Sequence, residues 1–144
     1  MFSKACQYGI KASVYIASKS AEGIRTNLRD IADNIDSPEA FTAKILHKLA
    51  KQNILNSLKG PTGGFDIPEG RSKSIKLSDI VSAIDGDSIY EGCALGFESC
   101  DALQPCPMHN KFVGIRDDLK VMLENTSLYE LANGLGYGGT YLKR

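Results

Sequence analysis

The chain has 144 residues, and its 17 Lys and Arg balance its 17 Asp and Glu, so the formal net charge at pH 7 is zero. This length fits one ordinary domain, or a small domain with an oligomerisation element, and it can bury a core without disulfide bonds. No apolar run approaches the roughly 20 residues that span a bilayer, and the first residues lack the apolar region of a signal peptide. We therefore expect a cytoplasmic protein with no membrane partner.

The charged residues are unevenly distributed along the chain. Residues 1–60 contain nine Lys and Arg against five Asp and Glu, whereas residues 61–144 contain eight against twelve. This asymmetry fits an anion-binding face in the first half and an acidic regulatory region in the second.

Helical periodicity predicts two helices before residue 35. Apolar residues recur at three- and four-residue steps from Ser3 to about Ser20, which indicates an amphipathic helix. Asn27 can cap a second helix from Leu28 to about Asn34.

A third helix has a clear start signal. Ser37 is the predicted N-cap, Pro38 takes the first helical position, and Glu39 lies in the first turn. Because a tight connection joins this helix to the short one before it, the pair has the proportions of a helix-turn-helix. The expected buried stripe is Phe41, Ile45, Leu46 and Leu49, and the expected opposite face is Thr42, Lys44, Lys48 and Lys51.

Two short β-prone segments follow the third helix. Residues 54–58 and 65–67 read as strands, and the Gly- and Pro-rich residues 59–64 between them read as a turn. A hairpin directly after a recognition helix is a wing. A fourth helix is predicted over residues 77–85, because apolar residues recur at helical spacing and Gly86 ends the pattern.

The next segment gathers Cys93, Cys100, Cys106 and His109 into 17 residues that contain few structure formers. Deprotonated cysteine binds iron–sulfur clusters, histidine can replace cysteine on an iron, and Gly and Pro let a chain wrap around an inorganic core. The paired C-x2-C spacing of zinc sites is absent. The pattern favours an iron–sulfur cluster, with thiol chemistry or zinc as alternatives. Cys6 is expected in the core, or as a ligand that crosses between subunits.

A last helix is predicted from about residue 107 to residue 125. Its apolar seam suits a partner helix and would form a dimer interface, while the glycine-rich tail, residues 133–144, is expected to be flexible. The predicted interface residues are Phe112, Ile115, Leu119 and Met122, and the same seam continues to Thr126 and Tyr129.

In this order the parts resemble the IscR/NsrR group of bacterial winged-helix transcription regulators. The resemblance rests on Tyr8-Gly9-Ile10 in the first helix, on the wing residues 59–65, on Ile80-Val81-Ser82-Ala83-Ile84-Asp85-Gly86, and on the three cysteines of the loop. It implies a mostly α fold with a small β-hairpin wing and a long C-terminal dimerisation helix. It also implies a homodimer that binds an inverted repeat in double-stranded DNA, and no enzymatic activity.

The resemblance also bears on the ligands. The IscR branch takes its fourth ligand from a His beyond the third Cys, which His109 matches, whereas the NsrR branch uses an Asp at the position of Gln7. The first cysteine gap is six residues here, one longer than is usual in the group. The first turn of the recognition helix lacks the Ser and Tyr of the IscR branch, so that branch's DNA site does not carry over.

The sequence thus predicts a winged helix-turn-helix over residues 1–76, followed over residues 77–132 by the fourth helix, the cluster-binding loop at about 90–109 and the dimerisation helix. Its predicted function is that of a repressor-type regulator whose cluster, [2Fe-2S] rather than [4Fe-4S], senses redox state, iron–sulfur status or nitric oxide. A cluster-free thiol sensor and an iron–sulfur electron carrier are the alternatives. The predicted DNA-contacting residues are Glu39, Ala40, Phe41 and Thr42 for bases, Lys44 and Lys48 for phosphates, and Lys59, Gly60 and Pro61 for the minor groove.

Overall fold

A computed structural model describes residues 1–136 and 138–144. The helices and strands are, along the chain, α1 (Lys4–Ala21), α2 (Leu28–Ile35), α3 (Glu39–Lys51), β1 (Asn56–Leu58), β2 (Gly64–Asp66), the 3-10 helix η1 (Arg71–Lys73), α4 (Leu77–Asp85), α5 (Ser88–Glu91), α6 (His109–Asn125) and α7 (Leu128–Asn133). The predicted elements appear in the expected order, whereas η1, α5 and α7 were not predicted. The prediction of a mostly helical fold with a two-stranded wing is confirmed. No helix within the described ranges is long and apolar enough to cross a membrane.

Helix α1 forms the centre of the core. Ser3 caps it, because its side chain accepts a hydrogen bond from the backbone N–H of Cys6 at 3.0 Å. Its buried face packs against α2, α3, α4 and α7. Cys6 and Ile16 on this face are fully buried, so the predicted amphipathic helix is confirmed and the other elements assemble around it.

Helices α2 and α3 form the predicted helix-turn-helix. Asn27 caps α2 by accepting from the N–H of Asp30 at 2.8 Å, and Asp36 ends α2 with a left-handed backbone, φ 53°. Asp tolerates this conformation better than most residues, so it supports the sharp turn before α3. The predicted N-cap of α3 was one residue too early, because Pro38 occupies that position and the Ser37 hydroxyl instead contacts the Thr42 hydroxyl.

Strands β1 and β2 pair antiparallel, with Ser57 opposite Phe65. Strand β1 is two residues shorter than predicted, because Ile54 and Leu55 lie buried ahead of it. Strand β2 has the predicted length but begins one residue earlier, so Ile67 lies buried after it. A third segment supports the hairpin, because Thr26 and Phe65 exchange backbone hydrogen bonds of 3.1 and 2.7 Å. Gly64 is required there, since a Cβ at this position, where φ is 141°, would collide with the carbonyl oxygen of Thr26.

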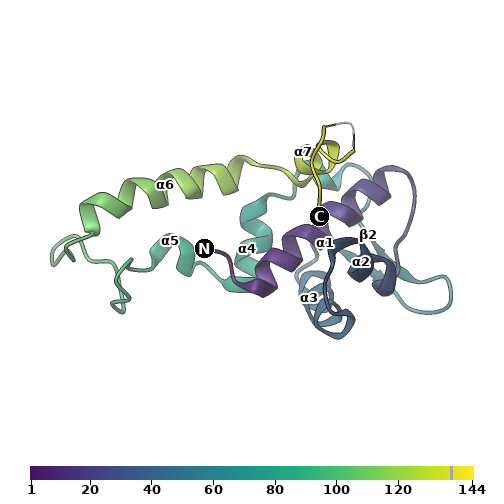
Figure 1. Cartoon of the computed structure of the whole chain (residues 1–144), viewed down its shortest axis with the longest axis horizontal. Helices are drawn as coiled ribbons and strands as arrows, with labels where there is room; N and C mark the ends of the chain where they lie inside the picture. Colours follow the sequence, from purple (N-terminus) through teal and green to yellow (C-terminus); the bar gives the residue numbers. More distant parts are fainter. Residues whose placement is uncertain (137) are drawn as a thin grey trace.

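Helices α5 and α6, with the cysteine loop between them, project from this body as an arm (Figure 1). Leu123 is fully buried near the end of α6 and anchors the arm on the core. Helix α6 ends at Asn125, because the backbone at Thr126 turns extended and its carbonyl accepts from the N–H of Leu77 at 3.0 Å. The predicted seam was therefore wrong beyond residue 125, and Tyr129 belongs to the separate helix α7.

Leu142 and Lys143, near the end of the chain, contact the body of the fold. Leu142 packs against the core, and the Lys143 ammonium donates to the carbonyl of Asp33, near the C-terminus of α2, at 2.8 Å. A cation in this position is favourable, because the last carbonyls of a helix carry partial negative charge. Residues 140–144 therefore return to the helix-turn-helix instead of extending away from it.

Candidate functional site

The outer face of α3 carries a set of exposed side chains. Glu39, Ala40, Phe41, Lys44 and Lys48 are all exposed, so five of the predicted contact residues are accessible to a ligand. Phe41 was also expected in the buried stripe, and that part of the prediction was wrong: its side chain is 36% exposed and its ring packs edge-on against Tyr8, with centroids 5.7 Å apart.

Thr42 does not face outward, which contradicts its prediction as a base contact. Its side chain is fully buried, and its hydroxyl donates to the carbonyl of Pro38 at 2.8 Å and contacts the hydroxyl of Ser37. The heptad-like spacing placed it opposite the core, but a hydroxyl can enter the interior when it returns a hydrogen bond to the preceding turn. Thr42 therefore holds the first turn of α3 in place and cannot reach a base edge.

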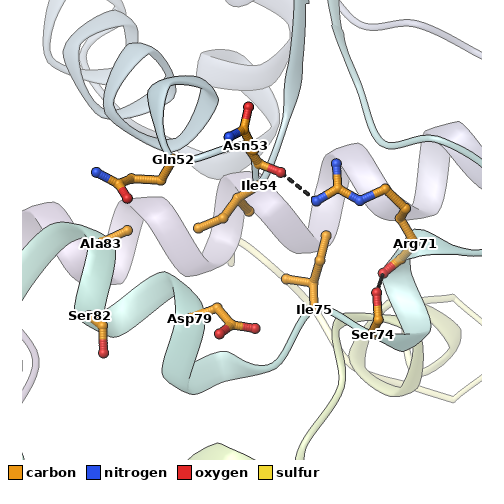
Figure 2. Close-up of a pocket in the computed structure, with 9 residues that line it drawn as sticks. All are labelled: Gln52, Asn53, Ile54, Arg71, Ser74, Ile75, Asp79, Ser82 and Ala83. Carbon is orange, nitrogen blue, oxygen red and sulfur yellow. Dashed lines mark hydrogen bonds between the residues drawn. The ribbon is translucent and has the colours of Figure 1, made fainter.

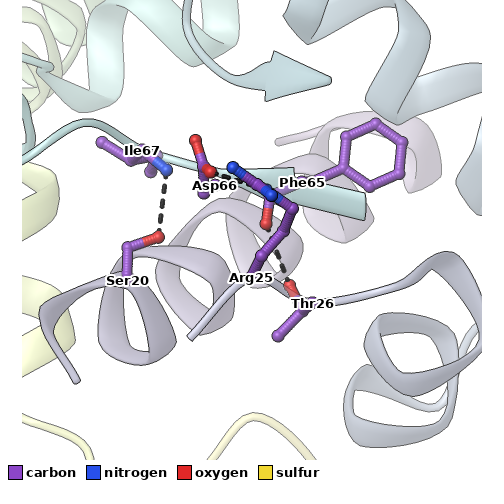
Figure 3. Close-up of polar contacts among 6 residues, drawn as sticks. All are labelled: Ser20, Arg25, Thr26, Phe65, Asp66 and Ile67. Atoms are coloured by element: carbon purple, nitrogen blue, oxygen red, sulfur yellow. Dashed lines mark hydrogen bonds and ion pairs between the residues drawn. The ribbon is translucent and has the colours of Figure 1, made fainter. Parts of the chain in front are cut away.

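The wing is fixed to the body by a set of polar contacts, shown in Figure 3. Arg25 pairs with Asp66 through Nε and Oδ2 at 2.9 Å, and the N–H of Ile67 donates to the Ser20 hydroxyl at 3.0 Å. Together with the Thr26 bridge, they set the direction of the hairpin. Its tip, Lys59, Gly60 and Pro61, is exposed, as a DNA-contacting wing requires.

The sequence did not indicate a basic surface on α1, although the structure places one beside α3. The ammonium groups of Lys4 and Lys11 lie 5.0 and 5.9 Å from the centre of the Tyr8 ring, which itself contacts Phe41. The available signal was the seven-residue spacing of the two lysines, which puts them on one face of a helix. They place two cations beside the aromatic pair that Tyr8 forms with Phe41 in the first turn of α3.

The C-terminal part of α3 is connected to α4 at one place, and the residues that follow α3 are connected to η1 at a second. The Lys48 ammonium donates to the carbonyl of Ile84, the penultimate residue of α4, at 3.2 Å. Figure 2 shows the second place, a polar cavity of about 450 Å³ between the end of α3, η1 and α4, where the Arg71 guanidinium donates to the carbonyl of Asn53. The recognition helix is therefore tied to the helix that leads into the arm.

The cysteine loop spans residues 92–108 and contains two pairs of potential ligands. The sulfurs of Cys93 and Cys106 are 3.7 Å apart, and the Cys100 sulfur lies 3.3 Å from Nδ1 of His109, the first residue of α6. A cavity of about 460 Å³ is lined by all three cysteines. Backbone N–H groups of Leu95 and Phe97 lower the pKa of the Cys93 thiol, because they donate hydrogen bonds that favour its thiolate.

The side chains of the loop have the chemistry of metal ligands and lie close together in pairs. Two thiolates on one tetrahedral metal lie roughly 3.7 Å apart when the metal–sulfur bonds are about 2.3 Å long, which is the separation of Cys93 and Cys106. In residues 1–136 and 138–144, however, no group of three or more His, Cys, Asp or Glu is arranged to hold one metal ion. The loop therefore offers its potential ligands in two separate pairs.

Cys6 lies on α1 and is not part of the cysteine loop. It is fully buried on α1, and burial together with the charge of Asp85 raises the pKa of its thiol to about 12. A thiol that resists deprotonation in the core is a poor metal ligand. Of the two roles expected for Cys6, the structure gives it the packing role.

The seam predicted for dimerisation is only partly exposed. Ile115 and Met122 are 59% and 44% exposed on α6, whereas Phe112 is half-buried and Leu119 packs against the core of its own chain. The arm is held by Arg116, whose Nη1 donates to the carbonyl of Gly92 at 2.7 Å, immediately before Cys93. The residue was not singled out in the sequence, because a lone Arg on a helix reads as a solvated charge.

Comparison with known proteins identifies the family. The Rrf2 family model, described as an iron-dependent transcriptional regulator, matches residues 2–134. A chain of Aquifex aeolicus, described only as a candidate HTH-type transcriptional regulator, is 29% identical over 135 residues, 92% of each chain. The HTH-type transcriptional regulator IscR of Pectobacterium atrosepticum is 27% identical over 127 residues, 88% of this chain and 76% of that one.

Solved structures share the fold. CymR, the global cysteine regulator of B. subtilis, superposes with a TM-score of 0.75 at 23% identity, over 94% of this chain and 98% of that one. IscR of T. potens gives a TM-score of 0.73 at 16% identity, over 97% and 91%. The family match and the named relatives indicate transcriptional regulation and not catalysis. The chain is therefore a member of the Rrf2 family of DNA-binding transcriptional regulators.

Proposed function

We propose that the chain is a cytoplasmic, repressor-type regulator whose DNA binding is controlled by a [2Fe-2S] cluster. The observation that carries the proposal is the arrangement of the loop in two ligand pairs, Cys93 with Cys106 and Cys100 with His109. Each pair would hold one iron. When bound, the cluster supplies a redox-active centre that responds to oxidants, to iron–sulfur supply or to nitric oxide.

The DNA-binding surface consists of the first turn of α3, the wing and the basic residues of α1. Glu39, Ala40 and Phe41 are exposed at the start of α3, where short groups meet base edges in the major groove, and Glu39 can accept from cytosine N4. Lys44 and Lys48 would contact phosphates, as would Lys4 and Lys11 of α1. The wing tip, residues 59–61, enters the adjacent minor groove.

The exposed part of the α6 seam would hold two chains together. A large apolar side chain such as Ile115, exposed in one chain, is stabilised when a second copy covers it. Two-fold symmetry then presents two winged helix-turn-helix units, which suits an inverted repeat in the operator.

Contacts within the chain connect the loop to the recognition helix. Arg116 fixes Gly92 to α6, while the far end of α5 joins α4 at residues 86–87. The end of α4 contacts two of the three proposed DNA-binding elements, α3 and α1. Ile84 accepts from Lys48, and the Asp85 carboxylate accepts from the N–H and hydroxyl of Ser3, which caps α1. A change in the loop can thus shift α3 and α1 relative to the operator.

Thiol sensing without a cluster is the second candidate. The 3.7 Å separation of Cys93 and Cys106 favours it, because neighbouring thiols can oxidise to a disulfide. A neighbour in fold, CymR, is named as a cysteine regulator in B. subtilis, and its S. aureus counterpart has been solved in an oxidized form. The electron-carrier alternative finds no support among the named relatives, which are transcriptional regulators.

Anaerobic purification tests the proposal. The expected result is a coloured protein with two iron and two sulfide per chain. Cys100→Ala should lose most of this iron, and His109→Ala should retain a labile cluster, because other donors can partly replace an imidazole. A colourless, iron-free chain that still binds DNA would favour thiol sensing, and full, stable iron in the Cys100→Ala variant would contradict the assigned ligands.

A further inference from the structure

Cys93 and Cys106 lie close to each other, and both are partly accessible to solvent. Their sulfurs are 3.7 Å apart, and both residues are half-buried in a loop at the end of the arm, so small solutes can reach them. The other two cysteines are engaged differently: Cys100 contacts the His109 ring, and Cys6 is enclosed in the core. Cys93 and Cys106 are therefore the two cysteines best placed to form a disulfide.

We infer that, when the cluster is absent, Cys93 and Cys106 form an intrachain disulfide on exposure to a hydroperoxide. The chemical step rests on the geometry of the loop, whereas its regulatory meaning rests on the proposed cluster function. Closing the bond requires the sulfurs to approach from 3.7 Å to about 2.05 Å, a shift that side-chain rotation in a loop can supply.

The oxidation proceeds in two steps with hydrogen peroxide as the oxidant. One sulfur of the pair attacks a peroxide oxygen, the O–O bond breaks, and the products are a sulfenic acid and water. The second sulfur then attacks the first, the S–O bond breaks, the S–S bond forms, and a second water leaves. Two electrons pass from the two sulfurs to the peroxide, and both thiol protons end in water.

The disulfide would act as a block on cluster assembly. It occupies both sulfurs of one ligand pair, so one iron would lose both of its protein ligands until a reductant opens the bond. The disulfide also joins residue 93 to residue 106, which lies just before α6. Residue 93 is already held near α6, because Arg116 bonds to the neighbouring Gly92. The oxidised chain is thus a distinct apo state that does not return to the cluster-bound state on its own.

Thiol counting on the full-length, metal-free chain tests the inference. Under denaturing conditions the reduced wild type should show four free thiols, and brief treatment with hydrogen peroxide should leave two, restored to four by dithiothreitol. The matched variant Cys100→Ser should go from three to one. Cys93→Ser and Cys106→Ser should form no intrachain disulfide.

Peptide mapping identifies the bond. Cleavage after Lys and Glu releases residues 92–98, with Cys93, and residues 99–111, with Cys100 and Cys106. After alkylation of free thiols, the expected species is these two peptides joined by a disulfide, with the alkyl group on Cys100. Four remaining thiols, a disulfide through Cys100, or a loss that dithiothreitol does not reverse would each overturn the inference.

A reconstitution arm separates this inference from the proposed function. Reduced apo-protein, never exposed to peroxide, is given ferrous iron and sulfide, and peroxide-treated protein is given the same without a thiol reductant. The reduced protein should take up iron, and the peroxide-treated protein should take up at least tenfold less. If the reduced protein takes up no iron, the cluster proposal is contradicted, but the disulfide inference is not. If a disulfide-bonded sample takes up as much iron as the reduced protein, the inference that the disulfide blocks cluster assembly is overturned.

Discussion

Thr42→Val separates a structural from a base-reading role at the start of α3. Valine has nearly the same shape as threonine but removes the hydroxyl, which donates to the Pro38 carbonyl at 2.8 Å and contacts Ser37. The Pro38 carbonyl keeps the backbone N–H of Thr42 as a partner at 2.9 Å, and the half-buried Ser37 can turn to water. Because neither group is orphaned, the loss should be near that of one or two ordinary hydrogen bonds, about 1–2 kcal/mol.

The assay pairs urea unfolding with selection from a randomised DNA library. Thr42→Val should lower the free energy of unfolding by about 1–2 kcal/mol and leave the preferred bases unchanged. The exposed Glu39→Gln is the matched variant: it should barely alter stability, yet lose discrimination of roughly 1–3 kcal/mol at one base pair. A Thr42→Val protein of unchanged stability and altered base preference would refute the burial of Thr42 and the orientation of α3.

Three further predictions follow from exposed groups. Ile115→Asp should produce monomers in sedimentation, whereas Val121→Asp, equally exposed at 59% but on another face of α6, should remain dimeric; two dimers would move the interface elsewhere. Lys44→Gln should reduce the salt dependence of DNA binding by about 0.9 per half-site, and Lys111→Gln on α6 should not; equal slopes would remove Lys44 from the interface. Deleting residues 141–144 should lower the free energy of unfolding by about 1–2 kcal/mol, because Leu142 and the Lys143 bond to α2 are lost; an unchanged urea midpoint would show that this contact is unimportant.

Local signals in the sequence were enough for most of the body of the fold, but not for α7, which packs against α1. Periodicity located α1 to α4, and the Gly-rich turn located the wing, because each depends on a few neighbouring residues. The errors arose where tertiary contacts decided. Thr42 is buried through a hydroxyl bond to the preceding turn, and α6 stops at Asn125 because Thr126 pairs with the strand-like segment before α4. Neither contact can be predicted from the residue pattern of the helix in which it occurs.

The candidate site was also predicted in part, from local signals. Ligand types and spacing indicated the four residues of the loop, but not their pairing, since a loop with six- and five-residue gaps has many closed forms. The pairing of Cys93 with Cys106 emerges only from the path between α5 and α6. Likewise, Arg116 was not singled out and Lys48 was predicted only as a phosphate contact. Their contacts with Gly92 and Ile84 show how the arm connects to the recognition helix.

The central claim is that the state of the loop sets the affinity for DNA. The most direct measurement is the Kd for a library-selected operator, determined anaerobically by fluorescence anisotropy on one preparation before and after removal of the cluster, with the thiols kept reduced. The two Kd values should differ at least tenfold, which corresponds to a coupling free energy of about 1.4 kcal/mol between the two sites. Equal Kd values for the cluster-bound and cluster-free dimers would contradict the central claim.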